Sequence, residues 1–156
     1  LALDDHVAFP GFVSDDQVRR AICSADVCLA PDPKNAYTDV STLVKIAEYL
    51  ALSRPVVSFD LTESRVTAGD AAVFAGNGDP TEFASLIEEL LDDPDRRAAL
   101  GAHGRARVER ELAWEHSKEA LLAAYDRALQ DGRQAAAAGR AEANLIGEWM
   151  AKPSNR

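Results

Sequence analysis

The stretch ADVCLAPDPKNAYTDVSTLVKIAEYLALSRPVVSF, residues 25–59, decides the fold that the sequence predicts. It opens with a mostly apolar run at 26–30 that lacks polar alternation, as expected for a parallel strand covered on both faces. A polar loop follows over 31–40, and the spacing of apolar residues then predicts a helix over 43–52. An Arg-Pro pair ends this helix, and a second strand follows at 56–59. Strand, helix and strand joined by short links indicate a βαβ unit.

The same alternation continues on both sides of this stretch. Upstream, a β-prone run at 7–9 predicts a strand, and Ser14 is placed to cap a helix whose first turn is acidic. Downstream, a short helix from Thr62 precedes a predicted strand at 71–75. The sequence therefore predicts an α/β fold with a Rossmann-like, doubly wound parallel sheet flanked by helices. Such sheets usually have more strands, and no GxGxxG or P-loop motif is present. Either phosphate is bound in another way, or the opening strands lie outside this chain.

The second half of the sequence is predicted to be helical. Pro80 and Pro94 each stand at the first turn of a predicted helix, and a third helix is predicted over 114–129. Their leucine and aromatic stripes are interpreted as core packing. Gly101 and Gly104 interrupt the second of these helices, which indicates a break or close packing.

One domain and a tail follow from this organisation. Residues 1–130 are predicted to form a partial Rossmann-like domain, and residues 131–156 an Ala-rich tail that is helical or frayed.

Composition narrows the function classes. The chain has 156 residues, with 17 Lys and Arg against 26 Asp and Glu, and its formal net charge is −9. This balance argues against nucleic acid and against passive docking on an acidic membrane surface. Arginines at 96–110 alternate with acidic residues and indicate a solvated face. No run reaches the ~18 apolar residues of a transmembrane helix.

The cysteines and histidines of the sequence do not predict a metal-binding site. Cys23 and Cys28 are expected to be two buried free thiols, which fits a reducing, cytoplasmic compartment. The three histidines are far apart in the sequence and predict no metal site.

The candidate site lies where the strand at 26–30 leads into the next helix, because ligands of open α/β sheets bind at the carboxyl ends of strands. With the helix started at Ser41, the spacing places Ser41, Lys45 and Glu48 on one face. Free N–H groups, the helix dipole and an ammonium suit a phosphate, and a carboxylate can accept hydrogen bonds from a vicinal diol such as ribose. The alternative is an ordinary Lys45–Glu48 pair on a solvated face.

Several segments together carry a family resemblance. They are GFV (11–13), ADVCLAP (25–31), STLVKIAEYLA (41–51), RPVVSFD (54–60) and GAHGRARVERELAWE (101–115). In this order they resemble the C-terminal half of a retaining glycosyltransferase of family four, with the GT-B fold, and the resemblance covers residues 1–130. The similarity is greatest to bacterial members that make surface polysaccharides. It implies the donor-binding domain of an enzyme that transfers a sugar, with retention, from a nucleoside diphosphate sugar to a saccharide or lipid-linked acceptor.

The resemblance also implies roles for individual residues. Glu48 resembles the second Glu of the family's Glu-seven-Glu motif, which holds the ribose hydroxyls. Backbone amides near Ser41 and Thr42 would meet the diphosphate or the sugar. The first Glu of the motif falls on Val40, and the adjacent Asp39 can substitute for it with a one-residue shift. Lys45 is not a family-wide feature. The loop that would line the base consists of Gly11, Phe12 and Val13.

Partners follow from the same resemblance. The family needs no obligatory metal or cofactor, and the nucleotide sugar is its substrate. Its N-terminal acceptor-binding domain is expected outside this chain, so the chain alone is expected to be inactive and to self-associate through unpaired strand edges. The parent enzyme is expected in the cytoplasm, at the periphery of the inner membrane.

Two other functions and one further group of residues stay open. The rival functions are a nucleotide-sugar epimerase of GT-B architecture and a non-catalytic nucleotide-binding or interaction module. Asp60, Glu63 and Arg65 follow the strand at 56–59 and either border the pocket or form a capped surface turn.

Overall fold

The computed structural model describes residue 3 and residues 5–150, and its chain divides into two compact units, Leu1–Leu112 and Ala113–Arg156. The first unit holds the sheet and the second holds one long helix. The domain boundary predicted at residue 130 stays a prediction.

Three parallel strands form the sheet, in the order β1-β2-β3. β1 (Cys28–Ala30) pairs with β2 (Val56–Phe59), and β2 pairs with β3 (Ala72–Ala75). All four residues of β2 are buried, as its unbroken apolar pattern predicts. The predicted fold class, a parallel Rossmann-like sheet flanked by helices, is confirmed.

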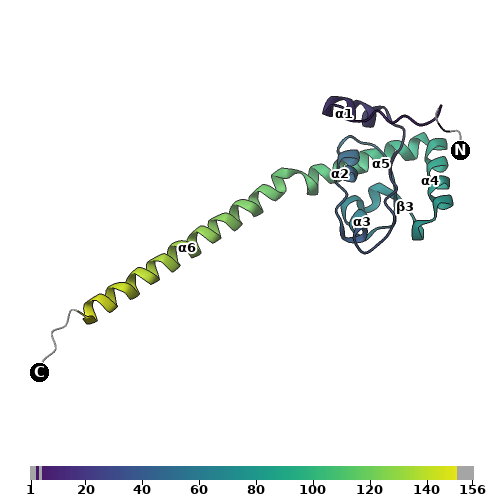
Figure 1. The fold of residues 1–156 in the computed structure, drawn as a ribbon. Coiled ribbons are helices and arrows are strands. Elements are labelled where there is room, and N and C mark those ends of the chain that lie inside the picture. The colour runs from purple at the N-terminus through teal and green to yellow at the C-terminus, as the bar shows by residue number, and fades with distance from the viewer. Residues whose placement is uncertain (1–2, 4, 151–156) are drawn as a thin grey trace, which may run out of the picture. The chain divides into compact units, whose positions relative to one another are not determined.

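Helices cover both faces of this sheet (Figure 1). On one face, α2 (Val44–Ala51) and α3 (Thr62–Ala68) pack with Val56. On the other face, Val57 packs with Phe83 and Leu90 of α4 (Pro80–Asp92). Neighbouring residues of β2 therefore face opposite layers, which is the period of two that a strand imposes. The remaining helices of this unit are α1 (Asp15–Ser24) and α5 (Pro94–Arg107), and α5 is followed by a π turn at Val108–Leu112. Short 3-10 turns lie earlier in the chain, at Thr38–Val40, Gly69–Ala71 and Gly76–Gly78.

The predicted strand at 7–9 is wrong, because no strand forms there. Phe9 is 90% exposed and Val7 is exposed as well. A run of three apolar residues gains strand geometry only when a neighbouring strand supplies hydrogen bonds and a covered face, and this run has neither.

The helix that leads away from β1 begins later than predicted. α2 starts at Val44 with Leu43 as its N-cap, so Ser41 lies before the helix and does not share a face with Lys45 and Glu48. The Ser41 hydroxyl donates to the Tyr37 carbonyl (2.6 Å), and the Thr42 hydroxyl donates to Glu63 (3.1 Å). Both hydroxyls are thus engaged away from the first turn of α2, and neither caps it.

Close packing explains the two glycines of α5. A Cβ atom at Gly101 would lie 2.3 Å from the carbonyl oxygen of Ser53, and one at Gly104 would lie 2.6 Å from Cδ2 of Leu50. Ser53 follows α2 and has a positive φ of 57°. The packing alternative predicted for these glycines is confirmed.

Arginines at the two ends of α5 bond to the last carbonyls of other helices. Arg105 donates to Ala51 in α2 (2.6 Å), and Arg107 donates to Val66 (2.8 Å) and Thr67 (2.9 Å) in α3. Arg97 donates to the carbonyls of Leu90 and Leu91 in α4, each at 2.6 Å. These groups are the unsatisfied carbonyls of helix ends. The predicted solvated face is wrong for Arg97 and Arg107, whose side chains are only 20% and 22% exposed, whereas Arg105 is half exposed as predicted.

In the described residues, the second unit consists mainly of one helix, α6 (Trp114–Met150). This helix extends beyond the one predicted over 114–129. Leu121, Leu122 and Tyr125 are exposed, so the core packing predicted for this stripe is wrong. None of the helices in the described part of the chain is long and apolar enough to cross a membrane.

The two cysteines are free, but their surroundings differ. Cys28 is buried in β1, whereas Cys23 is exposed on α1, so the expected burial of Cys23 is wrong. Burial raises the pKa of the Cys28 thiol to about 11.

Candidate functional site

Two segments meet at the carboxyl edge of the sheet. The segment 31–43 leaves β1 and leads to α2, and the segment beginning at Asp60 leaves β2 and leads to α3. This edge is where open α/β sheets hold ligands. Four of the predicted binding residues lie in the first segment or just after it: Asp39, Ser41, Thr42 and Lys45.

Asp39 is bound to the amino end of α3 through both of its carboxylate oxygens. Oδ1 accepts the Thr62 backbone N–H at 2.8 Å, and Oδ2 accepts the Thr62 hydroxyl at 3.1 Å. The Lys34 ammonium lies 3.3 Å from Oδ1. The hydrogen bond from the Thr62 backbone, and then the neighbouring Lys34, hold the pKa of the Asp39 carboxyl below its usual value. Leu61, the N-cap of α3, offers no side-chain bond, so Asp39 supplies it from a distant part of the chain.

Further bonds join the same two segments. Thr42 donates to Glu63, and the Lys34 ammonium also donates to the Asp60 carbonyl at 3.3 Å. The segment 31–43 is therefore held against the beginning of α3 at several points.

Asp60 and Arg65 form an ion pair at the end of β2. Arg65 Nη2 donates to Asp60 Oδ2 at 2.9 Å, and the guanidinium lies 4.5 Å from the centre of the Phe74 ring. The Arg65 hydrogen bonds hold the pKa of the Asp60 carboxyl below its usual value. Asp60 and Glu63 lie beside the segment 31–43 through their bonds with Lys34 and Thr42, and Arg65 is held next to them by Asp60.

Lys45 pairs with Asp32 rather than with Glu48. Its Nζ lies 2.7 Å from Asp32 Oδ2, and its side chain is 39% exposed. The alternative of an ordinary Lys45–Glu48 pair on α2 is therefore not the arrangement in the structure. Asp32 partly neutralises the ammonium while leaving it open to solvent.

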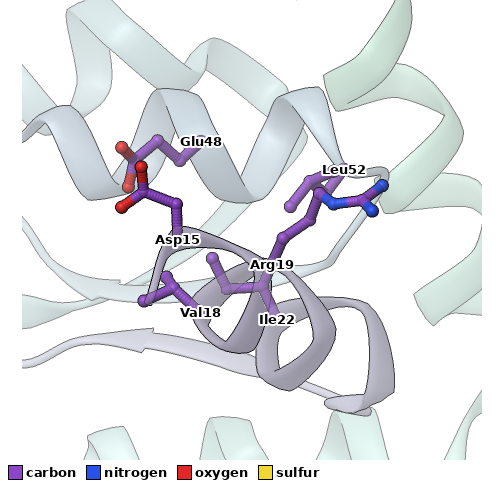
Figure 2. A pocket seen from close by; sticks show the side chains of 6 residues that line it. All are labelled: Asp15, Val18, Arg19, Ile22, Glu48 and Leu52. Carbon is purple, nitrogen blue, oxygen red and sulfur yellow. The ribbon is translucent and has the colours of Figure 1, made fainter. Parts of the chain in front are cut away.

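Glu48 faces an open groove of about 290 Å³ between α1 and α2. Figure 2 shows the Glu48 and Asp15 carboxylates at one end of this groove, with the aliphatic side chains of Val18 and Ile22 beside them. The remaining lining residues are Arg19 and Leu52. An acceptor next to an apolar wall suits a ligand that carries hydroxyls on one side and a flat ring on the other.

The structure does not place the predicted base loop in this groove. Gly11 has a positive φ of 69°, and Phe12 is fully exposed. Val13 is partly buried and stands two residues before α1, the helix that forms one wall. The loop is therefore next to the groove in sequence and absent from its lining.

Sequence reasoning missed several partners at this edge. It named neither Asp32 as the partner of Lys45 nor Asp15 as a neighbour of Glu48. It treated Thr62 only as a helix cap, although Thr62 receives its cap from Asp39. Such pairs join residues far apart in the chain, and one sequence carries no signal for them.

In the described residues, no group of three or more His, Cys, Asp and Glu side chains is arranged to hold a metal ion.

Comparison with known proteins assigns the family. Residues 1–93 match the family model described as glycosyl transferases group 1. The chain is 35% identical over 127 residues to a GDP-mannose-dependent monoacylated alpha-(1-6)-phosphatidylinositol monomannoside mannosyltransferase of Corynebacterium glutamicum, with 78% of this chain and 33% of that protein covered. It is 30% identical over 141 residues to a D-inositol 3-phosphate glycosyltransferase of Kineococcus radiotolerans, with 84% and 31% covered.

The matches cover most of this chain but only part of each relative. The chain spans about a third of the length of the curated relatives that it matches. The parallel sheet and its flanking helices agree with the C-terminal half of a GT-B glycosyltransferase. On the family match over 1–93 and these relatives, the chain belongs to the group 1 glycosyl transferases.

Proposed function

We propose that this chain binds the nucleoside diphosphate sugar in a glycosyltransferase that transfers the sugar to a saccharide or lipid-linked acceptor with retention of configuration. One observation carries the proposal: Glu48 stands in an open, largely apolar groove between α1 and α2, one turn along α2 from Lys45. The family supports sugar transfer, and the expectation of retention rests on the resemblance of the sequence alone.

Each group of the candidate site suits one part of such a donor. The Glu48 carboxylate accepts hydrogen bonds from ribose hydroxyls, and the aliphatic wall formed by Val18 and Ile22 covers the base. Lys45 and the backbone amides ahead of α2 attract the diphosphate. As the bond from the anomeric carbon to the diphosphate breaks, these groups stabilise the negative charge on the leaving oxygen.

The relatives' names support the classes of donor and acceptor. One name includes GDP-mannose and a phosphatidylinositol monomannoside, a lipid-linked saccharide, and the other includes inositol 3-phosphate. We therefore propose a nucleoside diphosphate hexose as the donor and a polyhydroxylated or lipid-linked acceptor, bound by a region that the relatives carry outside the matched third.

Calorimetric titration of the natural full-length protein with UDP, GDP and ADP tests the proposal. Glu48→Gln should weaken binding of the preferred nucleotide about three- to tenfold, because a neutral amide recovers only part of a charge-assisted hydrogen bond. A 2′,3′-dideoxy nucleotide has no diol and should bind the variant and the parent equally.

The matched control is Glu88→Gln, which makes the same change at an exposed position of α4. It should bind like the parent. Equal affinity of Glu48→Gln and the parent for the diol-bearing nucleotide would refute the donor-site assignment.

A further inference from the structure

The family resemblance offered Asp39 as a replacement for a sugar-binding carboxylate. In the structure, both carboxylate oxygens accept hydrogen bonds from Thr62 instead. Oδ1 accepts from the Thr62 N–H and lies near Lys34, and Oδ2 accepts from the Thr62 hydroxyl. Three donors thus already surround the two oxygens, and they hold the carboxylate against the amino end of α3.

The position of Asp39 gives those bonds a second consequence. Asp39 belongs to the 3-10 turn Thr38–Val40, which lies directly before Ser41 and the first turn of α2. Its own N–H donates to Asn35 (3.0 Å), and the Ser41 N–H donates to Thr38 (3.3 Å). The backbone around Asp39 is thus hydrogen-bonded to itself, and the Asp39 side chain connects it to the first residue of α3, beside the Thr42–Glu63 bond.

We propose that Asp39 is a positioning residue that fastens the segment 38–43 to the amino end of α3, fixes the backbone amides ahead of α2, and does not itself bind the donor. The consequence for ligand binding rests on the proposed function, because those amides are the ones proposed to meet the diphosphate. Without the Asp39–Thr62 bonds, the segment 38–43 has to become ordered when the ligand binds. The entropy cost of that ordering lowers the affinity.

The position of Thr62 allows a variant that leaves Asp39 untouched. Thr62 is the first residue of α3, where proline is favoured and its missing N–H costs the helix nothing. Leu61 has φ −104° and ψ 144°, which is the extended geometry that a following proline requires. Thr62→Pro therefore removes both donors to Asp39 while preserving the helix start and the Asp39 charge.

Four variants of the natural full-length protein separate the two roles of Asp39: Thr62→Pro, Asp39→Ala, their double variant, and Asp39→Asn. Under the positioning role, Thr62→Pro and Asp39→Ala each weaken nucleoside diphosphate binding about three- to tenfold, with little change for the free nucleoside. The double variant is no weaker than either single one, because both remove the same connection.

Asp39→Asn is expected to stay within about twofold of the parent, since its amide oxygen still accepts the Thr62 N–H and its amide nitrogen can donate to the hydroxyl. If Asp39 contacted the donor directly, Thr62→Pro would bind like the parent and Asp39→Ala alone would be weak. That pattern would overturn the proposal.

Hydrogen exchange tests the fastening without any ligand. Asp39→Ala should speed exchange of the Asp39-position and Ser41 amides, while exchange in β2 stays as in the parent. Unchanged exchange at those amides overturns the proposal even if Thr62→Pro does not fold. Glu48→Gln, measured alongside, tests the donor site separately, because a failure there leaves the exchange result standing.

Discussion

The two ends of the α2 helix are held in opposite ways. At its amino end, the segment 31–43 is fixed by side-chain hydrogen bonds and ion pairs, such as Asp39 with Thr62 and Lys45 with Asp32. At its carboxyl end, Gly101 of α5 stands so close to the Ser53 backbone that a methyl group does not fit. Polar bonds exposed to water can be exchanged for others at small cost, whereas backbone contact cannot. Substitutions should therefore affect folding at the carboxyl end and ligand binding at the amino end.

Gly101→Ala should have the largest effect of all. Its Cβ would lie 2.3 Å from the Ser53 carbonyl oxygen, and only movement of backbone relieves that contact. We expect a loss of about 3 kcal/mol or more in the free energy of unfolding, measured by urea denaturation.

Gly132→Ala is the control for this change. Gly132 lies inside α6, and a Cβ there meets nothing within 4 Å. Alanine at this position should favour the helix by up to about 1 kcal/mol. A Gly101→Ala protein as stable as the parent would contradict the packing account.

Gly104→Ala should destabilise less. The Cβ would approach Cδ2 of Leu50 at 2.6 Å, and the end of a leucine side chain can turn away more easily than a backbone carbonyl. The expected loss is about 1–3 kcal/mol by the same measurement. Trimming the neighbour with Leu50→Val should reduce the penalty of Gly104→Ala in a double-mutant cycle, and simple additivity would argue against this contact.

Lys45→Ala and Asp32→Asn should change binding in opposite directions. Removing the ammonium should weaken nucleoside diphosphate binding more than monophosphate binding, and most at low salt, where charges are least screened. Removing its acidic partner should strengthen diphosphate binding, because the ammonium then interacts with the ligand alone. Each effect should be a few fold, with stability changed by less than about 1 kcal/mol because the pair is partly exposed. If both variants titrate like the parent, Lys45 has no part in the site.

A further effect concerns pH and the buried thiol of β1. Because the pKa of Cys28 is raised to about 11, from 9.0, the unfolded chain loses the thiol proton at a lower pH than the folded chain does. The stability linked to this group is complete below pH 9 and is lost as pH rises toward 11.

Urea midpoints measured at pH 8 and pH 10.5 should therefore fall more in the parent than in Cys28→Ala. Equal changes of the midpoint in the two proteins would show that Cys28 is not linked to unfolding.

The sequence predicted what depends on local pattern. The unbroken apolar run of β2, the Ser14 start of α1 and the prolines that begin α4 and α5 all led to correct elements. The exposed run at 7–9 failed as a strand because strand formation depends on a partner that the run itself does not encode.

The candidate site shows the same limit. The placement of Glu48 and Lys45 on α2 was predictable from spacing, because both lie inside the helix. The start of α2 was not, because Ser41 and Thr42 donate their hydroxyl hydrogens to Tyr37 and Glu63 rather than capping the helix. Hydrogen-bond choices between distant residues are settled by the fold, so one sequence cannot reveal them.

The arginines of α5 also bear on how this unit forms during synthesis. Helices α2, α3 and α4 precede α5 in the chain, yet each has carbonyls at its end that bond to Arg105, Arg107 or Arg97. Until residue 107 has left the ribosome, the carbonyls at those helix ends stay exposed to water. The side of α2 that packs against α5 also stays uncovered. We therefore expect the first unit to become resistant to proteolysis abruptly, once α5 has left the ribosome, rather than helix by helix.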